Sequence, residues 1–143
     1  MKLLRVLLSI TIFAFIFSSC EKNDDNDPEA TVEKLLGIWK VEETSSTYGT
    51  QNYNVSISKD LYIQDVLSIY NFFGLGSFVR VVGEVVDDKL VLEPQNIDGF
   101  KIYGEGEIMN DYKRIEFAYT VEELATAKGS SQELVTAVYT LKD

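Results

Sequence analysis

The chain offers few side chains that could carry out catalysis. It contains no His and a single Cys, Cys20, so it cannot form a Ser-His-Asp or Cys-His catalytic unit, a His-based metal site, a zinc cluster or an intrachain disulfide. The best remaining pair for acid–base chemistry is Glu105 and Glu107, which share the polar face of one predicted strand. We expect this face to be the solvated outside of a sheet. The sequence therefore predicts no enzyme, no metal and no cofactor.

Aromatic side chains offer binding chemistry instead. The chain holds 8 Phe, 8 Tyr and 1 Trp. Four phenylalanines fall near predicted strand ends or in loops, where they could line the mouth of a barrel and bind a ligand: Phe72, Phe73, Phe78 and Phe100. An eight-stranded barrel either fills with side chains or holds one small ligand, so the alternative is that these rings are core and rim packing. Tyr48 and Tyr53, near a polar loop, could stack on sugar rings.

Composition and charge set the class of protein and exclude one class of partner. With 143 residues, 45% of them hydrophobic and 25% charged, the chain is typical of one globular domain. The 13 basic and 23 acidic residues give a net charge of −10. Because nucleic-acid binding requires positive charge to meet the phosphates, we expect no nucleic-acid partner.

The N-terminus has the three zones of an export signal. Lys2 and Arg5 provide positive charge, residues 7–17 form an apolar stretch, and two serines precede Cys20. We therefore predict a signal peptide over residues 1–19. The alternatives are a cleaved secretory signal followed by a chance Cys, or a signal-anchor helix.

The residues around Cys20 resemble the lipobox of bacterial lipoproteins. This resemblance implies that Cys20 is lipidated and that the protein is held on a membrane by its N-terminal lipid anchor. Residues 20–27 (CEKNDDND) then form an acidic tether, which is too polar to bury any surface. The residues just after the cysteine also resemble the export signal of surface lipoproteins of Bacteroidetes: Glu21, Lys22, Asp24 and Asp25. That implies a cell-surface-exposed outer-membrane lipoprotein, and the alternative is an ordinary linker.

A short helix and a series of strands follow the tether. Asp27 as N-cap, Pro28 at the first helical position and Gly37 beyond the end predict a helix over residues 28–36. From there the apolar residues alternate with a period of two, which predicts strands over residues 38–44, 53–58, 66–71, 78–86, 89–93, 100–109, 115–121 and 135–141. Residues 122–132 are expected to form a polar loop.

The connections decide how these strands are arranged. They are mostly short and contain no helix, whereas parallel strands require long crossovers, so the sheet should be antiparallel. A meander of about eight strands removes its edges best by closing into a barrel, and a β-sandwich is the alternative. Gly104 and Gly106 lie on the inner face of one strand, which suits strong coiling or a close approach of two backbones. We therefore predict an all-β, up-and-down antiparallel barrel with a short N-terminal helix.

Gly37-Ile38-Trp39, at the entry to the first strand, resembles the Gly-x-Trp signature of the lipocalin and wider calycin families. The chain over residues 37–141 is also similar to small calycin-like lipoproteins of Bacteroidetes, in the stretches 53–58, 71–76, 90–95 and 103–108. The resemblance implies a lipocalin-like barrel over residues 28–143, in which Gly37 and Trp39 close one end. It further implies a binding module for a small hydrophobic molecule or glycan. The alternative is a non-catalytic accessory lipoprotein whose solid barrel binds a protein partner.

Overall fold

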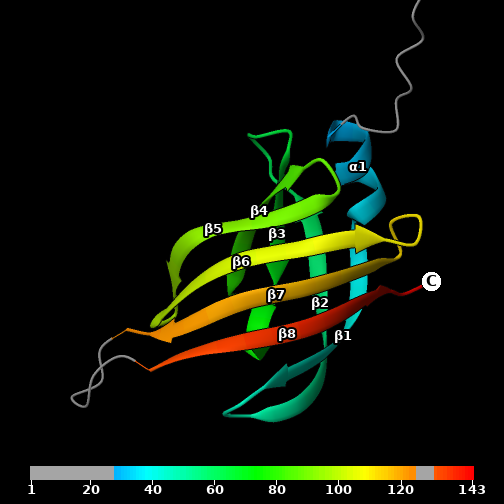
Figure 1. Ribbon diagram of the computed structural model, residues 1–143. Coiled ribbons are helices and arrows are strands. Elements are labelled where there is room, and N and C mark those ends of the chain that lie inside the picture. Colours follow the sequence, from blue (N-terminus) through cyan, green and yellow to red (C-terminus); the bar gives the residue numbers. More distant parts are fainter. Residues whose placement is uncertain (1–27, 125–130) are drawn as a thin grey trace, which may run out of the picture.

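The computed structural model describes residues 28–124 and 131–143. These residues form a closed antiparallel barrel in which each of eight strands pairs with the next and the last pairs with the first (Figure 1). The predicted fold class is confirmed, and the β-sandwich alternative is wrong. The predicted signal peptide, Cys20 and the acidic tether lie outside the described residues.

The strands follow one another around the barrel in sequence order. The helix α1 covers Pro28–Leu35, and the strands are β1 (Gly37–Ser45), β2 (Gly49–Lys59), β3 (Val66–Tyr70), β4 (Arg80–Val86), β5 (Lys89–Ile97), β6 (Phe100–Met109), β7 (Arg114–Glu123) and β8 (Gln132–Leu141). A short 3₁₀ turn, η2 (Phe72–Gly74), lies between β3 and β4. Among the residues that the structure describes, no helix has the length and apolar character needed to cross a membrane.

Several boundaries differ from the prediction; β2 starts at Gly49 rather than Tyr53, and β5 continues to Ile97 rather than Glu93. Other differences have a clear local reason. The helix stops at Leu35, shortly before Gly37, whose φ of +135° favours glycine and turns the chain into β1. Strand β4 starts at Arg80 rather than Phe78, because the Val79 amide donates to the Gly76 carbonyl within the turn. Strands β7 and β8 extend into the predicted polar loop, where Glu122 pairs with Gln132.

Alternation along each strand separates the core from the surface. In β1, Trp39 and Val41 are buried while Lys40 and Glu42 are exposed. The other strands contribute buried Val, Ile, Leu, Phe and Tyr side chains to the same core inside the barrel. Burial of each such side chain stabilises the fold by roughly 1.5–3 kcal/mol.

The two inner glycines of β6 allow the close approach that the sequence predicts. A Cβ atom at Gly104 would lie 2.5 Å from both the carbonyl oxygen of Ala118 and the Cα of Tyr119 on β7. At Gly106 it would lie 2.7 Å from the ring of Phe117. Only glycine therefore lets β6 and β7 pack at this distance, and this part of the prediction is confirmed.

The barrel has two different ends (Figure 1). We call the end next to α1 the helix end; it also holds the connections 60–65, 87–88 and 110–113. Trp39 is fully buried there, and its Nε1 donates to the Leu35 carbonyl at 2.9 Å. We call the opposite end the mouth; it holds the connections 46–48, 71–79 and 98–99.

Candidate binding site at the barrel mouth

A hollow of about 130 Å³ lies at the mouth, beside the ends of β7 and β8. Its aromatic wall consists of Tyr48, Phe73 and Phe100. The Phe73 ring meets the other two edge-on, with centroid distances of 5.8 Å to Tyr48 and 6.0 Å to Phe100. The remaining wall is mostly polar: Ser46, Thr47, Val121, Glu123, Ser131, Gln132 and Glu133. The hollow therefore combines aromatic faces with carboxylates.

The turn η2 places two phenylalanine rings at this end. Asn71 and Phe73 have left-handed backbones, with φ of 63° and 55°. The Asn71 side chain supports this turn, since its Nδ2 donates to the Asn54 carbonyl and its Oδ1 accepts from the Gly76 amide, both at 2.8 Å. Left-handed conformations of non-glycine residues cost roughly 1–3 kcal/mol and persist only where the surroundings impose them. The segment between β3 and β4 is thus held under local strain.

A polar cluster is buried inside the barrel, close to this end. Glu43 on β1 is only 2% exposed, and the hydroxyls of Tyr53 and Tyr119 both donate to its Oε2. The hydroxyl of Tyr139 on β8 is also buried, and it has no hydrogen-bond partner. Strand register explains the grouping: Tyr53 and Tyr139 lie opposite Val41 on either side, one inward position from Glu43. We call these four residues the Glu43 cluster.

Burial sets the protonation behaviour of this cluster. It raises the pKa of Glu43, the two tyrosine hydroxyls oppose that rise, and the negative charge of Glu133 adds to it. Burial, and after it the neighbouring charges, raise the pKa of Tyr53 and Tyr119. The pKa of Tyr139 is raised by burial and then by the charge of Glu43, and the nearby Tyr53 hydroxyl opposes this rise. The three tyrosines therefore stay protonated, and Tyr53 and Tyr119 act as hydrogen-bond donors to Glu43.

Glu133 gives the mouth a carboxylate that is held in its ionised form. Burial alone would raise its pKa, but hydrogen bonds from Ser46 and Thr47 outweigh this and lower it. The Ser46 hydroxyl and the Thr47 amide donate to Oε2 at 2.8 and 3.0 Å. A negative charge therefore stands at the hollow over the physiological pH range.

Aromatic rings separate the Glu43 cluster from the hollow. Phe72 is fully buried, with its ring centroid 4.8 Å from that of Tyr119 and 6.4 Å from that of Tyr139. The Phe73 ring meets Tyr119 edge-on at 6.3 Å. Phe73 also lines the hollow, so its ring contacts both the hollow and Tyr119.

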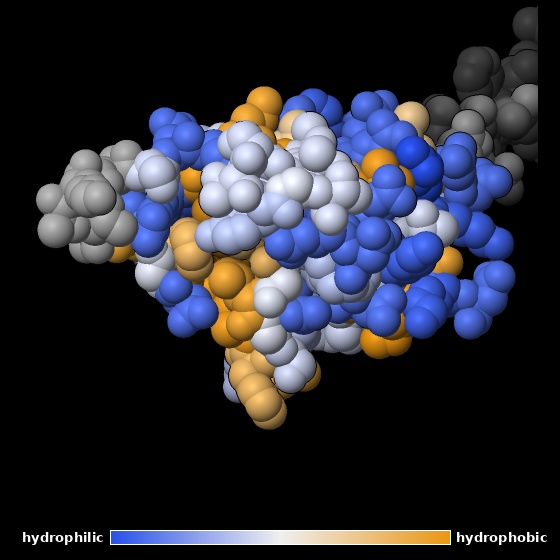
Figure 2. Space-filling view, turned by 90° about the horizontal axis from the view of Figure 1, so that it is seen from below, coloured by the Kyte–Doolittle hydropathy of each residue, from blue (hydrophilic) through white to orange (hydrophobic). Residues whose placement is uncertain are grey.

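The predicted site residues fall into different places. Phe73 and Phe100 line the hollow, whereas Phe72 lies inside the barrel. Phe78 is 98% exposed and does not line the hollow. Figure 2 shows the molecule from below, where apolar side chains form a strip between polar areas.

The remaining predicted residues divide between the two ends. Tyr48 belongs to the wall of the hollow, and Tyr53 turns its hydroxyl inward to Glu43. Gly37 and Trp39 lie at the helix end.

The sequence analysis missed Glu43, Tyr119 and Tyr139 as possible binding residues. One signal for Glu43 was present, because the alternation of β1 puts it on the same side as Trp39 and Val41. A charged residue on the apolar side of a strand is rarely buried without a function or a partner. Tyr119 and Tyr139 carry no such signal, since Tyr is an ordinary core residue.

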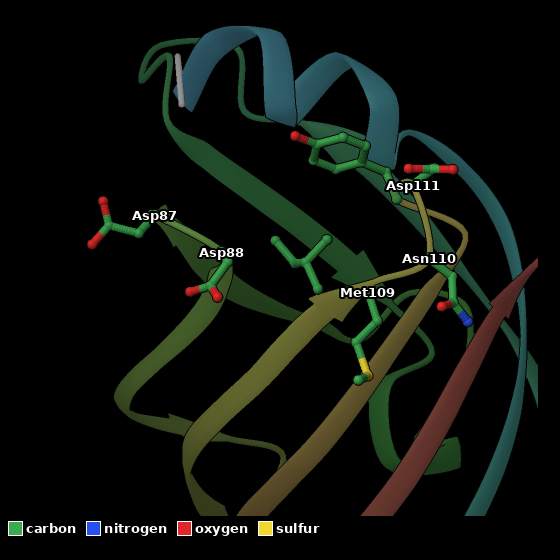
Figure 3. A pocket seen from close by; sticks show the side chains of 7 residues that line it. Asp87, Asp88, Met109, Asn110 and Asp111 are labelled. Carbon is green, nitrogen blue, oxygen red and sulfur yellow. The ribbon is translucent and has the colours of Figure 1, made fainter. Parts of the chain in front are cut away.

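A second hollow, of about 230 Å³, lies at the helix end (Figure 3). Asp87 and Asp88 lie on one side of it, and Asn110 and Asp111 lie on the other, without converging on a common point. Among the described residues, no group of His, Cys, Asp and Glu side chains is arranged to hold a metal ion. This hollow is lined by one aromatic residue, Tyr112, and by no buried polar group like those near the mouth.

Comparison with known proteins supports the fold. No family model and no curated protein matches the chain. A solved structure described as "Structure of EF1p2_mFAP2b bound to DFHBI" is 13% identical, with a TM-score of 0.59, over 80% of this chain and 98% of that one. A second, "Structure of a redesigned beta barrel, b11L5F_LGL", is also 13% identical, with a TM-score of 0.50, over 79% and 96% of the two chains. The chain is therefore similar to small β-barrel proteins.

Proposed function

We propose that the protein is a lipid-anchored binding module of the cell envelope, which takes up a small molecule through the barrel mouth. The observation that carries this proposal is the Glu43 cluster beneath an aromatic hollow. A buried carboxylate and an unpaired hydroxyl are costly in a core, where apolar side chains of similar volume are often as stable or more stable. A ligand that bonds to these groups accounts for their presence.

The fold is compatible with this role. The barrel of EF1p2_mFAP2b, which this chain resembles, is bound to DFHBI in its solved structure. We place this protein near the calycin-like lipoproteins of Bacteroidetes, on the strength of the Gly37-Ile38-Trp39 resemblance. The proposal includes no catalytic role and no cofactor.

The position of the helix suits a lipid anchor. Residues 1–19 would be removed as a signal peptide, and Cys20 would carry the lipid at the start of the tether. Because Pro28 begins α1 at the helix end, an anchor preceding it would leave the mouth at the opposite side of the barrel (Figure 1). A mouth that faces away from the membrane can receive a ligand from the surroundings. We propose an outer-membrane location with display on the cell surface.

Substitution of Cys20 tests the anchor. Cys20→Ser should abolish labelling by a radioactive fatty acid and move the protein from the membrane to the soluble fraction. In the chain that keeps Cys20, replacement of Glu21, Asp24 and Asp25 by Ala should protect the anchored protein from protease added to intact cells. Unchanged membrane partition of Cys20→Ser would contradict the anchor, and unchanged digestion would reduce the acidic stretch to a linker.

Ligand binding is tested on the full chain purified from its membrane. Native mass spectrometry should detect a small molecule that remains bound. Phe73→Ala should lower the bound fraction, because Phe73 forms the inner wall of the hollow. The matched control is Phe78→Ala, which removes an exposed ring outside the hollow. Equal retention by both variants would place the ligand elsewhere.

One observation favours the accessory role as a second candidate. Phe72 is completely buried inside the barrel, while Phe78 and Leu134 expose 98% and 66% of their surface near the mouth. These exposed apolar residues could contact a protein partner. Under this alternative the purified chain holds no small molecule, and cross-linking in intact cells captures a protein at positions 78 and 134.

A further inference from the structure

We propose that the ligand of the mouth is a small organic cation, whose ammonium group pairs with Glu43 and Tyr139 and whose apolar body lies among the aromatic rings. This inference rests on the proposed function and specifies the chemical class of its ligand. It distinguishes a cationic amine from the neutral hydrophobic or sugar ligands that the fold resemblance suggests.

The barrel interior holds a carboxylate without a positive partner among the described residues. Glu43 is a buried carboxylate, and none of the lysines and arginines in the described residues is buried. Two tyrosine hydroxyls stabilise the carboxylate but supply no positive charge. A carboxylate in a low-dielectric interior gains most from a cation at contact distance. A neutral sugar would leave this charge unpaired, and a fatty acid would add a second negative charge.

Glu43 and Tyr139 both have capacity for further hydrogen bonds. Both tyrosine hydroxyls donate to Oε2, so Oε1 of Glu43 keeps acceptor capacity for a further donor. The Tyr139 hydroxyl is buried without a partner, and its residue lies on the same inner face as Glu43. A primary ammonium group has three donors, enough for the carboxylate oxygen and the Tyr139 oxygen together.

Aromatic rings surround these polar groups. The Phe72 ring centroid lies 4.8 Å from that of Tyr119 and 6.4 Å from that of Tyr139. Aromatic faces attract a cation within about 6 Å through their quadrupole. Carboxylate and aromatic rings together are therefore complementary to an organic cation at both its charged and its apolar parts.

The charge at the mouth suits a cation. Phe73 lines the hollow, and its ring also meets Tyr119 of the Glu43 cluster edge-on. Glu123 and Glu133 also line the hollow. Such carboxylates raise the local concentration of cations and repel anions.

Three probes of similar size test the class of ligand: 2-phenylethylamine, 2-phenylethanol and 3-phenylpropionate. Each is titrated calorimetrically into the full chain at pH 7.5. We expect the amine to bind at least tenfold more tightly than the alcohol and the acid. Glu43→Gln should weaken amine binding at least tenfold, whereas Glu42→Gln, which changes the exposed neighbour, should leave it unchanged. Tyr139→Phe removes only an unpaired hydroxyl and should weaken amine binding about threefold or more. This second variant tests the proposal even if Glu43→Gln does not fold.

The outcomes separate this inference from the proposed function. Amine binding no tighter than alcohol binding, or amine affinity unchanged in both Glu43→Gln and Tyr139→Phe, overturns the cation. If no probe binds but a neutral or anionic small molecule co-purifies with the chain, the cation is overturned and the binding function stands. If no probe binds and nothing co-purifies, both are overturned, and the unpaired hydroxyl is explained by an ordered water alone.

Discussion

Glu43 occupies a position that the alternation of β1 otherwise gives to apolar or small side chains, between Val41 and Ser45. Two tyrosine hydroxyls compensate part of its lost hydration, and a raised pKa shows that the compensation is incomplete. The protonation of this one buried carboxylate therefore makes the stability of the barrel depend on pH. Glu43 therefore affects both the stability of the fold and the proposed binding chemistry.

Glu43 should make the free protein less stable as pH rises. The folded-state pKa of Glu43 lies above its ordinary value of 4.5, so between these two pKa values the folded state binds more protons than the unfolded state, and the free energy of unfolding falls with increasing pH. Glu43→Gln should therefore melt at a higher temperature than wild type at pH 7.5, with the difference disappearing near pH 4. Thermal melts from pH 4 to 8 measure this, with Glu42→Gln as control. A difference that does not change with pH would contradict it.

Trp39 should be the most sensitive single residue at the helix end. Its ring is fully buried, and its Nε1 donates to the Leu35 carbonyl, which couples α1 to β1. Trp39→Ala should lower the free energy of unfolding by about 3–5 kcal/mol, because truncation of a buried aromatic leaves a cavity. Urea unfolding of the chain checks this, and Ile38→Ala, at the half-exposed neighbour, serves as the control. A loss no larger than that of Ile38→Ala would show that the ring does not close this end.

The strands and the helix could be predicted because their signals are local. Alternation within each strand predicts β1 to β8, and the Pro28 and Gly37 positions predict α1. The predicted strand boundaries were wrong where hydrogen bonds within a turn set the start of the strand, as at Val79. The same division holds for the site: Phe73 and Phe100 could be proposed from their place in loops. The Glu43 cluster joins β1, β2, β7 and β8, and only strand register brings those residues together.

The pairing of β6 with β7 should depend on Gly104. A methyl group there would lie 2.5 Å from backbone atoms of β7, which cannot move aside without breaking the ladder. Gly104→Ala should therefore lower the free energy of unfolding by about 1–3 kcal/mol or more. Glu105→Ala, at the next and exposed residue, removes a surface ion pair with Lys89 and should cost less than about 1 kcal/mol. Equal unfolding midpoints for the two variants would contradict the close approach.

At the scale of the whole molecule, the two ends of the barrel have different surfaces. The connection between β2 and β3, at the helix end, exposes three consecutive apolar residues: Leu61 (89%), Tyr62 (93%) and Ile63 (57%). Asp60 Oδ1 accepts from the Tyr62 and Ile63 amides at 2.9 and 3.2 Å, which fixes the turn that presents them. Figure 1 shows this connection beside α1, on the side of the barrel away from the mouth. An apolar loop next to the proposed anchor is suited to contact with lipid.

The anchored protein should therefore rest on a membrane with Leu61 toward the lipid and the mouth away from it. The proposed acylation would block Cys20, so that a cysteine introduced as Leu61→Cys or as Leu134→Cys, near the mouth end of β8, can be labelled alone with a fluorescent maleimide. On phosphatidylcholine vesicles that contain a nitroxide lipid, the label at position 61 should be quenched several-fold more than the label at position 134. The Cys20→Ser background should remove this difference, since one exposed loop without an acyl chain gives only weak binding. Equal quenching at both positions in the anchored protein would mean that the barrel has no preferred orientation, and the outward-facing mouth would lose its physical basis.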